Sequence, residues 1–216
     1  MCRVEEPLLR ILHVDDDEAF LEVSKALLES EGDFKVDTVL SVNEAFQKLD
    51  AQKYDAVVAD YDMPLKDGLQ FLQELRQRYS DLPFIMFTGK GREEIVIKAL
   101  NLGADGYCNK HGKPEVVYGE LAHIIRVAAE RVKAKSALAE SERRYQTILE
   151  HAAEAFFVHD LNGKMLAVNQ QACKSLGYTK DELLALTVSD IDPYAPQLGA
   201  EFWPKALAGQ AVTFES

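Results

Sequence analysis

The stretch "DAVVADYDMPLKDG", residues 55–68, brings a carboxylate to the tip of an apolar segment. Residues 56–59 are all apolar and read as a buried strand, and Asp60 follows them directly. Asp62 and Gly68 are residue types common in loops and turns, so the strand is expected to end near Asp60. The pattern raises the question of why a chain delivers an acid to the end of a buried strand.

The composition sets the broad class of the protein. The 216 residues are enough for one or two domains, and 47% of them are hydrophobic, which is enough for a real core. The formal net charge of −12 argues against a nucleic-acid surface. No apolar run approaches the roughly 18 residues that span a bilayer. Direct contact with DNA or with a membrane is therefore not expected.

The N-terminus and the cysteines point to the compartment. Glu5 and Glu6 stand where a signal peptide needs basic residues. Cys2, Cys108 and Cys173 are few, odd in number and widely scattered, so they predict neither a disulfide framework nor a metal site. We expect a cytoplasmic protein in a reducing environment.

The first 110 residues alternate between the period of a strand and the period of a helix. This alternation predicts an α/β fold, in which a five-stranded parallel sheet is covered by helices on both faces. Ser41, with Glu44 three residues later, gives a capping-box pattern at one helix start. The expected strands are 8–14, 34–40, 54–60, 82–89 and 106–110, and the expected helices are 18–30, 42–52, 69–79, 92–103 and one after Pro114.

The last of these helices is expected to continue beyond the first domain, because no Gly or Pro occurs between Glu120 and Leu161. A weak coiled coil and a solvated connector helix with charge pairs one turn apart explain the segment equally well. Its apolar stripe also predicts a homodimer through the final helix and the linker. The stripe has 4-3-4 spacing and consists of Leu121, Ile125, Ala128 and Val132.

Beyond the helix, residues 155–170 read as two strands around the turn Asn162-Gly163. A short helix is expected to end at Gly177, and Thr179 with Glu182 gives a second capping-box pattern. The final residues, 211–216, look like the start of another strand.

Polar side chains stand at the end of four expected strands. In an open parallel sheet, sites form outside the carboxyl ends of the strands. Each of these residues alone has an ordinary explanation, such as a helix cap or a turn. Together they predict a site at one edge of the sheet. The residues are Asp15 and Asp16 after the first strand, Asp60 after the third, Thr88 at the fourth and Lys110 at the fifth.

The residue types suggest the chemistry. Clustered carboxylates repel each other, and a divalent oxygen-loving cation such as Mg²⁺ removes that cost. The metal can polarise a phosphoryl group, and Asp60 can then act as a nucleophile that carries the group covalently. Lys110 can pair with one phosphoryl oxygen, and the Thr88 hydroxyl can donate to another.

These residues make the sequence resemble the receiver domain of two-component response regulators. The matching text is "VDDD", "VVADYDMPLKDG", "MFTG" and "GYCNK", in residues 8 to about 128. The resemblance implies a flavodoxin-like doubly wound sheet with strand order 2-1-3-4-5. One departure is visible: the family usually has a cis proline directly after the lysine, whereas His111 follows Lys110 here and Pro114 comes later.

The resemblance also implies roles for individual residues. Asp60 takes a phosphoryl group from a sensor histidine kinase, and Thr88 and Tyr107 move together when the group arrives. The protein is then a phosphoacceptor rather than an enzyme with substrate turnover. The implied Mg²⁺ ligands are Asp15, Asp16, Asp60 and the backbone carbonyl of Asp62.

From about Tyr145 the sequence resembles the front part of a PAS sensor domain, through "ILEHAAEAFFVHDLNGKMLAVNQQACKSLGYTKDELL". His151 and His159 are candidate haem ligands, but isolated histidines near strands are more often structural, so no tightly bound cofactor is expected there. The expected organisation is a receiver domain at 1–128, a helical linker at 129–144 and a C-terminally incomplete PAS domain at 145–216.

Two other functions remain open at this stage. Haloacid-dehalogenase-type phosphatases also use a strand-end Asp-x-Asp with Mg²⁺, and "DYD" fits that motif, but their further acidic pair comes last in the chain, whereas here it comes first. The chain is alternatively the front of a hybrid sensor histidine kinase, although no His-Glu phosphorylation helix or Gly-rich ATP lid occurs within it. Steady turnover of a phosphate monoester would identify the phosphatase.

Overall fold

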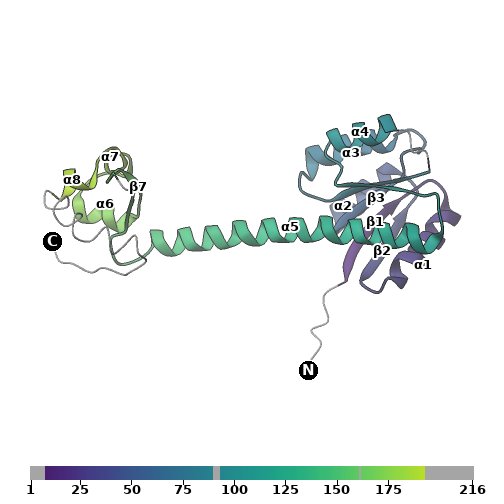
Figure 1. Ribbon diagram of the computed structural model, residues 1–216, viewed down its shortest axis with the longest axis horizontal. Helices are drawn as coiled ribbons and strands as arrows, with labels where there is room; N and C mark the ends of the chain where they lie inside the picture. The colour runs from purple at the N-terminus through teal and green to yellow at the C-terminus, as the bar shows by residue number, and fades with distance from the viewer. Residues whose placement is uncertain (1–7, 90–92, 161, 193–216) are drawn as a thin grey trace, which may run out of the picture. The chain divides into compact units, whose positions relative to one another are not determined.

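The computed structural model describes residues 8–89, 93–160 and 162–192, and its internal contacts divide the chain into two units, 1–137 and 138–216. The long helix α5 (Pro114–Glu150) contributes residues to both units (Figure 1). The domain limits at 128 and 144 stay predictions. The strand expected at 211–216 lies outside the described residues.

Unit 1 contains one five-stranded parallel sheet with the order β2-β1-β3-β4-β5 (Figure 1). The predicted fold class is therefore confirmed. In β3 all four residues are buried, as expected for a central parallel strand that is covered on both faces. The strands are β1 (Leu9–Val14), β2 (Phe34–Val39), β3 (Ala56–Ala59), β4 (Phe84–Thr88) and β5 (Gly106–Asn109).

Helices cover both faces of this sheet and create two apolar clusters. The cluster on one face is built from α2 (Val42–Ala51), α3 (Gly68–Arg78) and α4 (Glu93–Asn101). The cluster on the other face is built from α1 (Glu18–Ser30) and the first four turns of α5. The alternating strands and helices thus bury apolar side chains on both sides of the sheet.

Polar side chains at the starts of α2 and α3 accept backbone N–H groups of the first helical turn. The Asp67 side chain accepts the backbone N–H of Gln70 at 2.8 Å, and the Gln70 side chain accepts the backbone N–H of Asp67, which completes a capping box. The box predicted at Ser41 is only half formed. Ser41 accepts from the Glu44 N–H, but the Glu44 carboxylate accepts from the N–H of Leu40 instead of that of Ser41.

The helix α5 buries one face from Val117 to Ala129 against the sheet of unit 1. The predicted use of Leu121, Ile125 and Ala128 as a free dimer surface is wrong, because these side chains are buried inside unit 1. The 4-3-4 spacing serves helix-on-sheet packing here. None of the helices in the described ranges, α5 included, combines the length and apolarity needed to cross a lipid bilayer.

Gly106 allows α5 to approach β5 closely. A Cβ at this position would lie 2.3 Å from Cγ2 of Ile124, which is a clash. We expect Gly106→Ala to lower the free energy of unfolding by about 1–3 kcal/mol, as overpacking in a filled core does. Gly119→Ala is the matched control, because its Cβ would meet nothing within 4 Å and alanine favours a helix by up to about 1 kcal/mol. Urea unfolding of both variants checks the difference, and equal midpoints would contradict the packing argument.

The described residues of unit 2 form, after the end of α5, a two-stranded antiparallel sheet and three short helices. The predicted hairpin and the capping box at Thr179 are both present. Asn169 is buried and satisfies four backbone groups: its amide donates to the carbonyls of Leu149 and Glu154, and its oxygen accepts from the N–H groups of Phe156 and Ala172. The elements are β6 (Phe157–His159), β7 (Met165–Val168), α6 (Gln170–Leu176), α7 (Lys180–Ala185) and α8 (Val188–Ile191).

Candidate functional site

Three carboxylates gather at the carboxyl edge of the unit 1 sheet. Asp15 and Asp16 follow β1, and Asp60 follows β3, which pairs with β1 in parallel. One carboxyl oxygen from each residue lies within 4.8 Å of the others. Asp15 and Asp60 are buried, while Asp16 is exposed. Like charges therefore crowd together where water screens them poorly.

The ammonium of Lys110 lies between two of these acids. Its Nζ is 2.5 Å from Oδ2 of Asp15 and 3.1 Å from Oδ1 of Asp60. The contact with Asp60 is an ion pair without hydrogen-bond geometry, so Oδ1 accepts no hydrogen bond from the described residues. Oδ2 of Asp60 accepts the backbone N–H of Asp62 at 3.0 Å. Oδ1 of Asp60 is thus a buried carboxylate oxygen that faces the charge of Lys110 and accepts no hydrogen bond from the described residues.

The electrostatics of the pocket favour a cation. Burial raises the pKa of Asp15, although the hydrogen bond and charge of Lys110 act in the opposite direction. The single ammonium therefore does not offset the cost of burying this carboxylate. The carboxylates of one exposed and two buried acids are oxygen ligands of the kind that suits Mg²⁺. The donor set fits such an ion.

Thr88 and Tyr107 lie on neighbouring strands beside the pocket. Thr88 is the last residue of β4 and is buried, and its carbonyl accepts the backbone N–H of Lys110 at 3.1 Å. Tyr107 pairs with Met86 in the sheet and packs, partly buried, against the α2–α3–α4 cluster. Its hydroxyl is buried and has no hydrogen-bond partner among the described residues. Burial raises the pKa of that hydroxyl. An outward turn of the ring would restore solvation to it.

The loop after Lys110 departs from the family pattern without disturbing the lysine. The described residues contain no cis peptide bond, so the Lys110–His111 bond is trans. The backbone N–H of His111 donates to Oδ1 of Asn109 at 2.8 Å. The His111 ring lies against Gly89, where a Cβ would be 3.3 Å from Nε2. The side chain of Asn109 and the missing Cβ at position 89 accommodate this loop.

Two residues around the lysine are not predictable from the sequence. The Lys110 ammonium lies 4.4 Å from the ring centroid of Phe20, a cation–π contact. His13 is fully buried in β1, with Nδ1 3.1 Å from Oγ of Ser24. Burial and the positive charge of Lys110 lower the pKa of His13 from 6.5 to about 3, so the ring is neutral at pH 7. In the sequence, His13 lies within the apolar run of β1 and Phe20 lies at an apolar position of α1. Neither pattern indicates a contact with Lys110.

Unit 2 has a hollow of about 540 Å³ beside Asn169. Leu149, Phe156 and Val158 contribute apolar side chains to it, and Lys180 contributes a cation. His151 also lines it, whereas Nδ1 of His159 is 2.9 Å from the carbonyl of Asp160. The two histidines that were candidate haem ligands are thus in different surroundings.

A doubly wound parallel sheet whose acids and lysine meet at the strand ends defines a flavodoxin-like domain of the signalling type. The comparison with known families gives the particular assignment. The family model described as the response regulator receiver domain matches residues 11–122, which is over half of the chain. The chain therefore belongs to this family. A PAS domain model matches residues 143–208, so the receiver domain is followed by a PAS domain.

Individual proteins agree with this assignment. The chain is 34% identical over 145 residues to "Response regulator Rre1" of Synechocystis, covering 66% of this chain and 61% of that protein. It is 34% identical over 117 residues to the alkaline phosphatase synthesis transcriptional regulatory protein PhoP of Bacillus subtilis, covering 54% and 48%. A response regulator receiver domain structure from Clostridium thermocellum superposes with a TM-score of 0.53 at 29% identity, covering 59% of this chain and 98% of that one. The chain spans about half to three fifths of these curated relatives.

Proposed function

We propose that Asp60 accepts a phosphoryl group from a sensor histidine kinase and that the chain relays this event through α5 to its PAS domain. The observation that carries the proposal is the buried Oδ1 of Asp60, which faces Lys110 and accepts no hydrogen bond from the described residues. A nucleophile of this kind needs a desolvated oxygen beside groups that bind the incoming charge.

The roles of the side chains follow from their positions. The Asp60 oxygen attacks the phosphorus of a phosphohistidine, a P–O bond forms, the P–N bond breaks, and the leaving imidazole takes a proton from water. Lys110 binds a phosphoryl oxygen, and the Thr88 hydroxyl donates to another. Asp15, Asp16, Asp60 and the backbone carbonyl of Asp62 would hold Mg²⁺. The ion supplies a positive charge that neutralises the phosphoryl oxygens.

The partners proposed for this chain are proteins. A sensor histidine kinase supplies the phosphoryl group, and the PAS domain passes the signal to another protein in the cytoplasm. The relative PhoP is named as a transcriptional regulator, but the match covers only 48% of that protein. We propose no direct contact of this chain with nucleic acid, in keeping with its net charge of −12.

Incubation of the chain with acetyl phosphate and Mg²⁺ tests the proposed function. We expect intact mass spectrometry to find one added phosphoryl group per chain and no accumulation beyond it. Continuous release of phosphate from a phosphate monoester would instead support the phosphatase alternative. The absence of any added mass in the presence of Mg²⁺ would count against the proposal.

We still propose a homodimer through the linker part of α5. The contact would use a second apolar stripe, because Leu121, Ile125 and Ala128 are buried. Leu138, Tyr145 and Ile148 are 62%, 66% and 57% exposed, at the seven- and three-residue intervals of a coiled-coil seam. We expect phosphorylation to tighten this dimer by roughly 5- to 150-fold, the usual range of coupling between sites. Sedimentation velocity with and without beryllofluoride measures the change.

Two variants that introduce the same charge distinguish the contribution of the proposed seam to dimerisation from that of the rest of the helix. Tyr145→Glu puts a charge into the stripe and should keep the chain monomeric in both states. Ser136→Glu puts the same charge at an exposed position outside the stripe and should behave like the wild type. A weight-average mass that stays constant with concentration in both states would rule out the dimer.

A further inference from the structure

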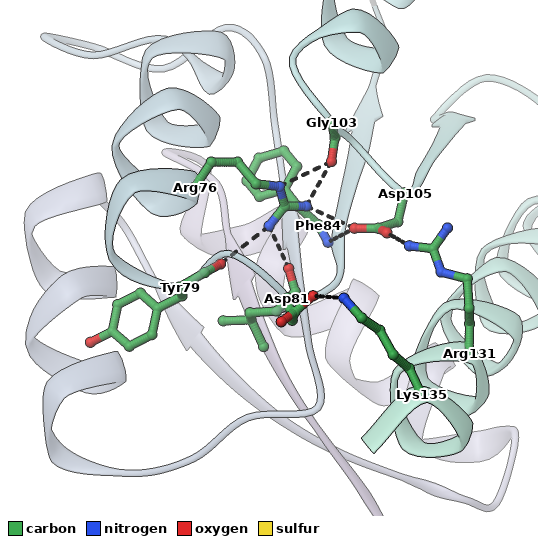
Figure 2. Close-up of polar contacts among 9 residues, drawn as sticks. Arg76, Tyr79, Asp81, Phe84, Gly103, Asp105, Arg131 and Lys135 are labelled. Carbon is green, nitrogen blue, oxygen red and sulfur yellow. Dashed lines mark hydrogen bonds and ion pairs between the residues drawn. The ribbon is translucent and has the colours of Figure 1, made fainter. Parts of the chain in front are cut away.

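Two basic side chains of α5 bind loops at the amino edge of the receiver sheet, opposite the carboxylate pocket. Arg131 forms an ion pair with Asp105, the residue just before β5. Nζ of Lys135 lies 2.6 Å from Oδ1 of Asp81, in the connection between α3 and β4. Figure 2 shows both side chains reaching from the helix to these acids.

Asp105 is fixed to the core of the receiver and also binds the helix. Its side chain is only 8% exposed. Oδ2 accepts the backbone N–H of Phe84 at 2.9 Å and Nη2 of Arg76 at 2.8 Å, which leaves Oδ1 for Arg131. Arg76 in turn donates to the carbonyls of Gly103 and Leu82 (Figure 2). Asp105 is therefore an anchor held by β4 and α3, and Arg131 on the helix is the exposed partner.

Apolar packing no longer holds α5 at this point. The last buried residue of the helix is Ala129, and among the described residues beyond it in unit 1 only Val132 is half-buried. Arg131 and Lys135 are themselves 68% and 70% exposed. The pair of Lys135 with Asp81 joins two exposed side chains, and in the pair of Arg131 with Asp105 the arginine is exposed. Ion pairs that water can reach stabilise a contact weakly, and weakly held segments open locally. The position of residues 130–137 therefore depends on interactions that are easily broken.

The strand β5 connects this anchor to the carboxylate pocket. It has four residues, and Asp105 precedes it, Tyr107 lies within it and Lys110 follows it. The backbone N–H of Asp105 also donates to the carbonyl of Phe84 at 2.8 Å, which joins the starts of β4 and β5. A movement of Thr88, at the far end of β4, or of Tyr107, two residues from Asp105 within β5, would be transmitted along these strands to Asp105.

We propose that Arg131 and Lys135 form a releasable latch that holds residues 130–137 of α5 on the receiver domain, and that loading of Asp60 opens it through β5. The second part rests on the proposed function of Asp60. Opening of the latch frees the helix to change its position relative to the receiver sheet. The signal would then leave the receiver domain at residues 130–137, where the two ion pairs dock the helix or release it.

Distances between two spin labels test the latch in the full chain. Labels at Gln77→Cys on α3 and Ser136→Cys on α5, with Cys2 and Cys173 replaced by Ser, report the docking of the helix by pulsed dipolar spectroscopy. We expect one narrow distance distribution without ligand. Beryllofluoride with Mg²⁺ should shift the ratio of docked to released chains at least fivefold toward release, the low end of typical coupling.

The variant R131Q/K135Q removes both charges of the latch and should give a broad distribution with and without beryllofluoride. R126Q is the matched control. It removes another ion pair of α5, the half-buried one to Asp33, in a part of the helix that apolar contacts also hold, and it should respond like the wild type. A narrow distribution in R131Q/K135Q, or the same broadening in R126Q, would refute the role of the latch.

The two parts of the proposal fail in distinguishable ways. Intact mass after acetyl phosphate reports separately whether Asp60 is loaded. A loaded chain with an unchanged distance distribution would overturn the coupling while leaving the phosphoacceptor role intact. A chain that takes up no phosphoryl group would overturn the role of Asp60, and the comparison of R131Q/K135Q with wild type would still decide whether the ion pairs dock the helix.

Discussion

The Asp60→Asn chain is expected to take up a phosphoryl group from acetyl phosphate at least roughly 100-fold more slowly than the wild type. The amide has nearly the size of the carboxylate, so the buried strand end keeps its packing. It lacks the negative charge that makes Oδ1 a nucleophile and that binds Lys110 at 3.1 Å. Intact mass spectrometry over a time course measures the loss.

Asp62→Asn is the matched control for this substitution. Asp62 lies two residues further along, its side chain is exposed, and its proposed contribution to the metal comes from the backbone carbonyl, which the substitution leaves in place. This variant should still take up one phosphoryl group. If Asp60→Asn is labelled as well as the wild type, or if Asp62→Asn alone loses labelling, then Asp60 is not the phosphoacceptor.

The Asp15→Asn chain is expected to lose Mg²⁺ affinity and to gain stability at neutral pH. Loss of one of three clustered carboxylates should weaken binding by at least the roughly 10- to 100-fold that outer-shell substitutions cost. The gain in stability follows from the raised pKa of Asp15, which burial causes. A carboxyl whose folded pKa lies above its unfolded value destabilises the fold once pH rises through that folded value.

The stability gained by Asp15→Asn should depend on pH. Wild-type stability should fall as pH rises from the ordinary Asp value of 3.8 through the raised folded value, and this part of the fall should be absent in Asp15→Asn. Urea unfolding at several pH values, without metal, measures the difference, and a Mg²⁺ titration of each chain measures affinity. A variant that is less stable at pH 7, or that binds Mg²⁺ like the wild type, would contradict the account.

The fold could be predicted because each local signal agrees with the global arrangement. The apolar run at 56–59 and the helical spacing on either side of it lead to a parallel sheet with covered faces, and that sheet is present. The strand-end rule also explains why Asp15, Asp60 and Lys110, far apart in sequence, lie together.

The face of α5 could not be predicted, for a physical reason. A 4-3-4 apolar stripe packs equally well against a sheet and against a second helix, and a single sequence does not say which surface is available. Leu121 and Ile125 pack against the sheet. The pairs of Arg131 with Asp105 and of Lys135 with Asp81 join positions 26 and 54 residues apart. No local spacing encodes such contacts.

The distance along the chain between Asp15 and Lys110 has a consequence for synthesis. These two residues are in contact at 2.5 Å but are separated by 95 positions. Asp60, between them in the sequence, is attached to a different strand, so no short segment contains the pocket. A ribosome must release the chain well past residue 110 before the fifth strand can pair and the pocket can close. A prematurely terminated product that ends before β5 therefore lacks Lys110 and cannot complete the pocket.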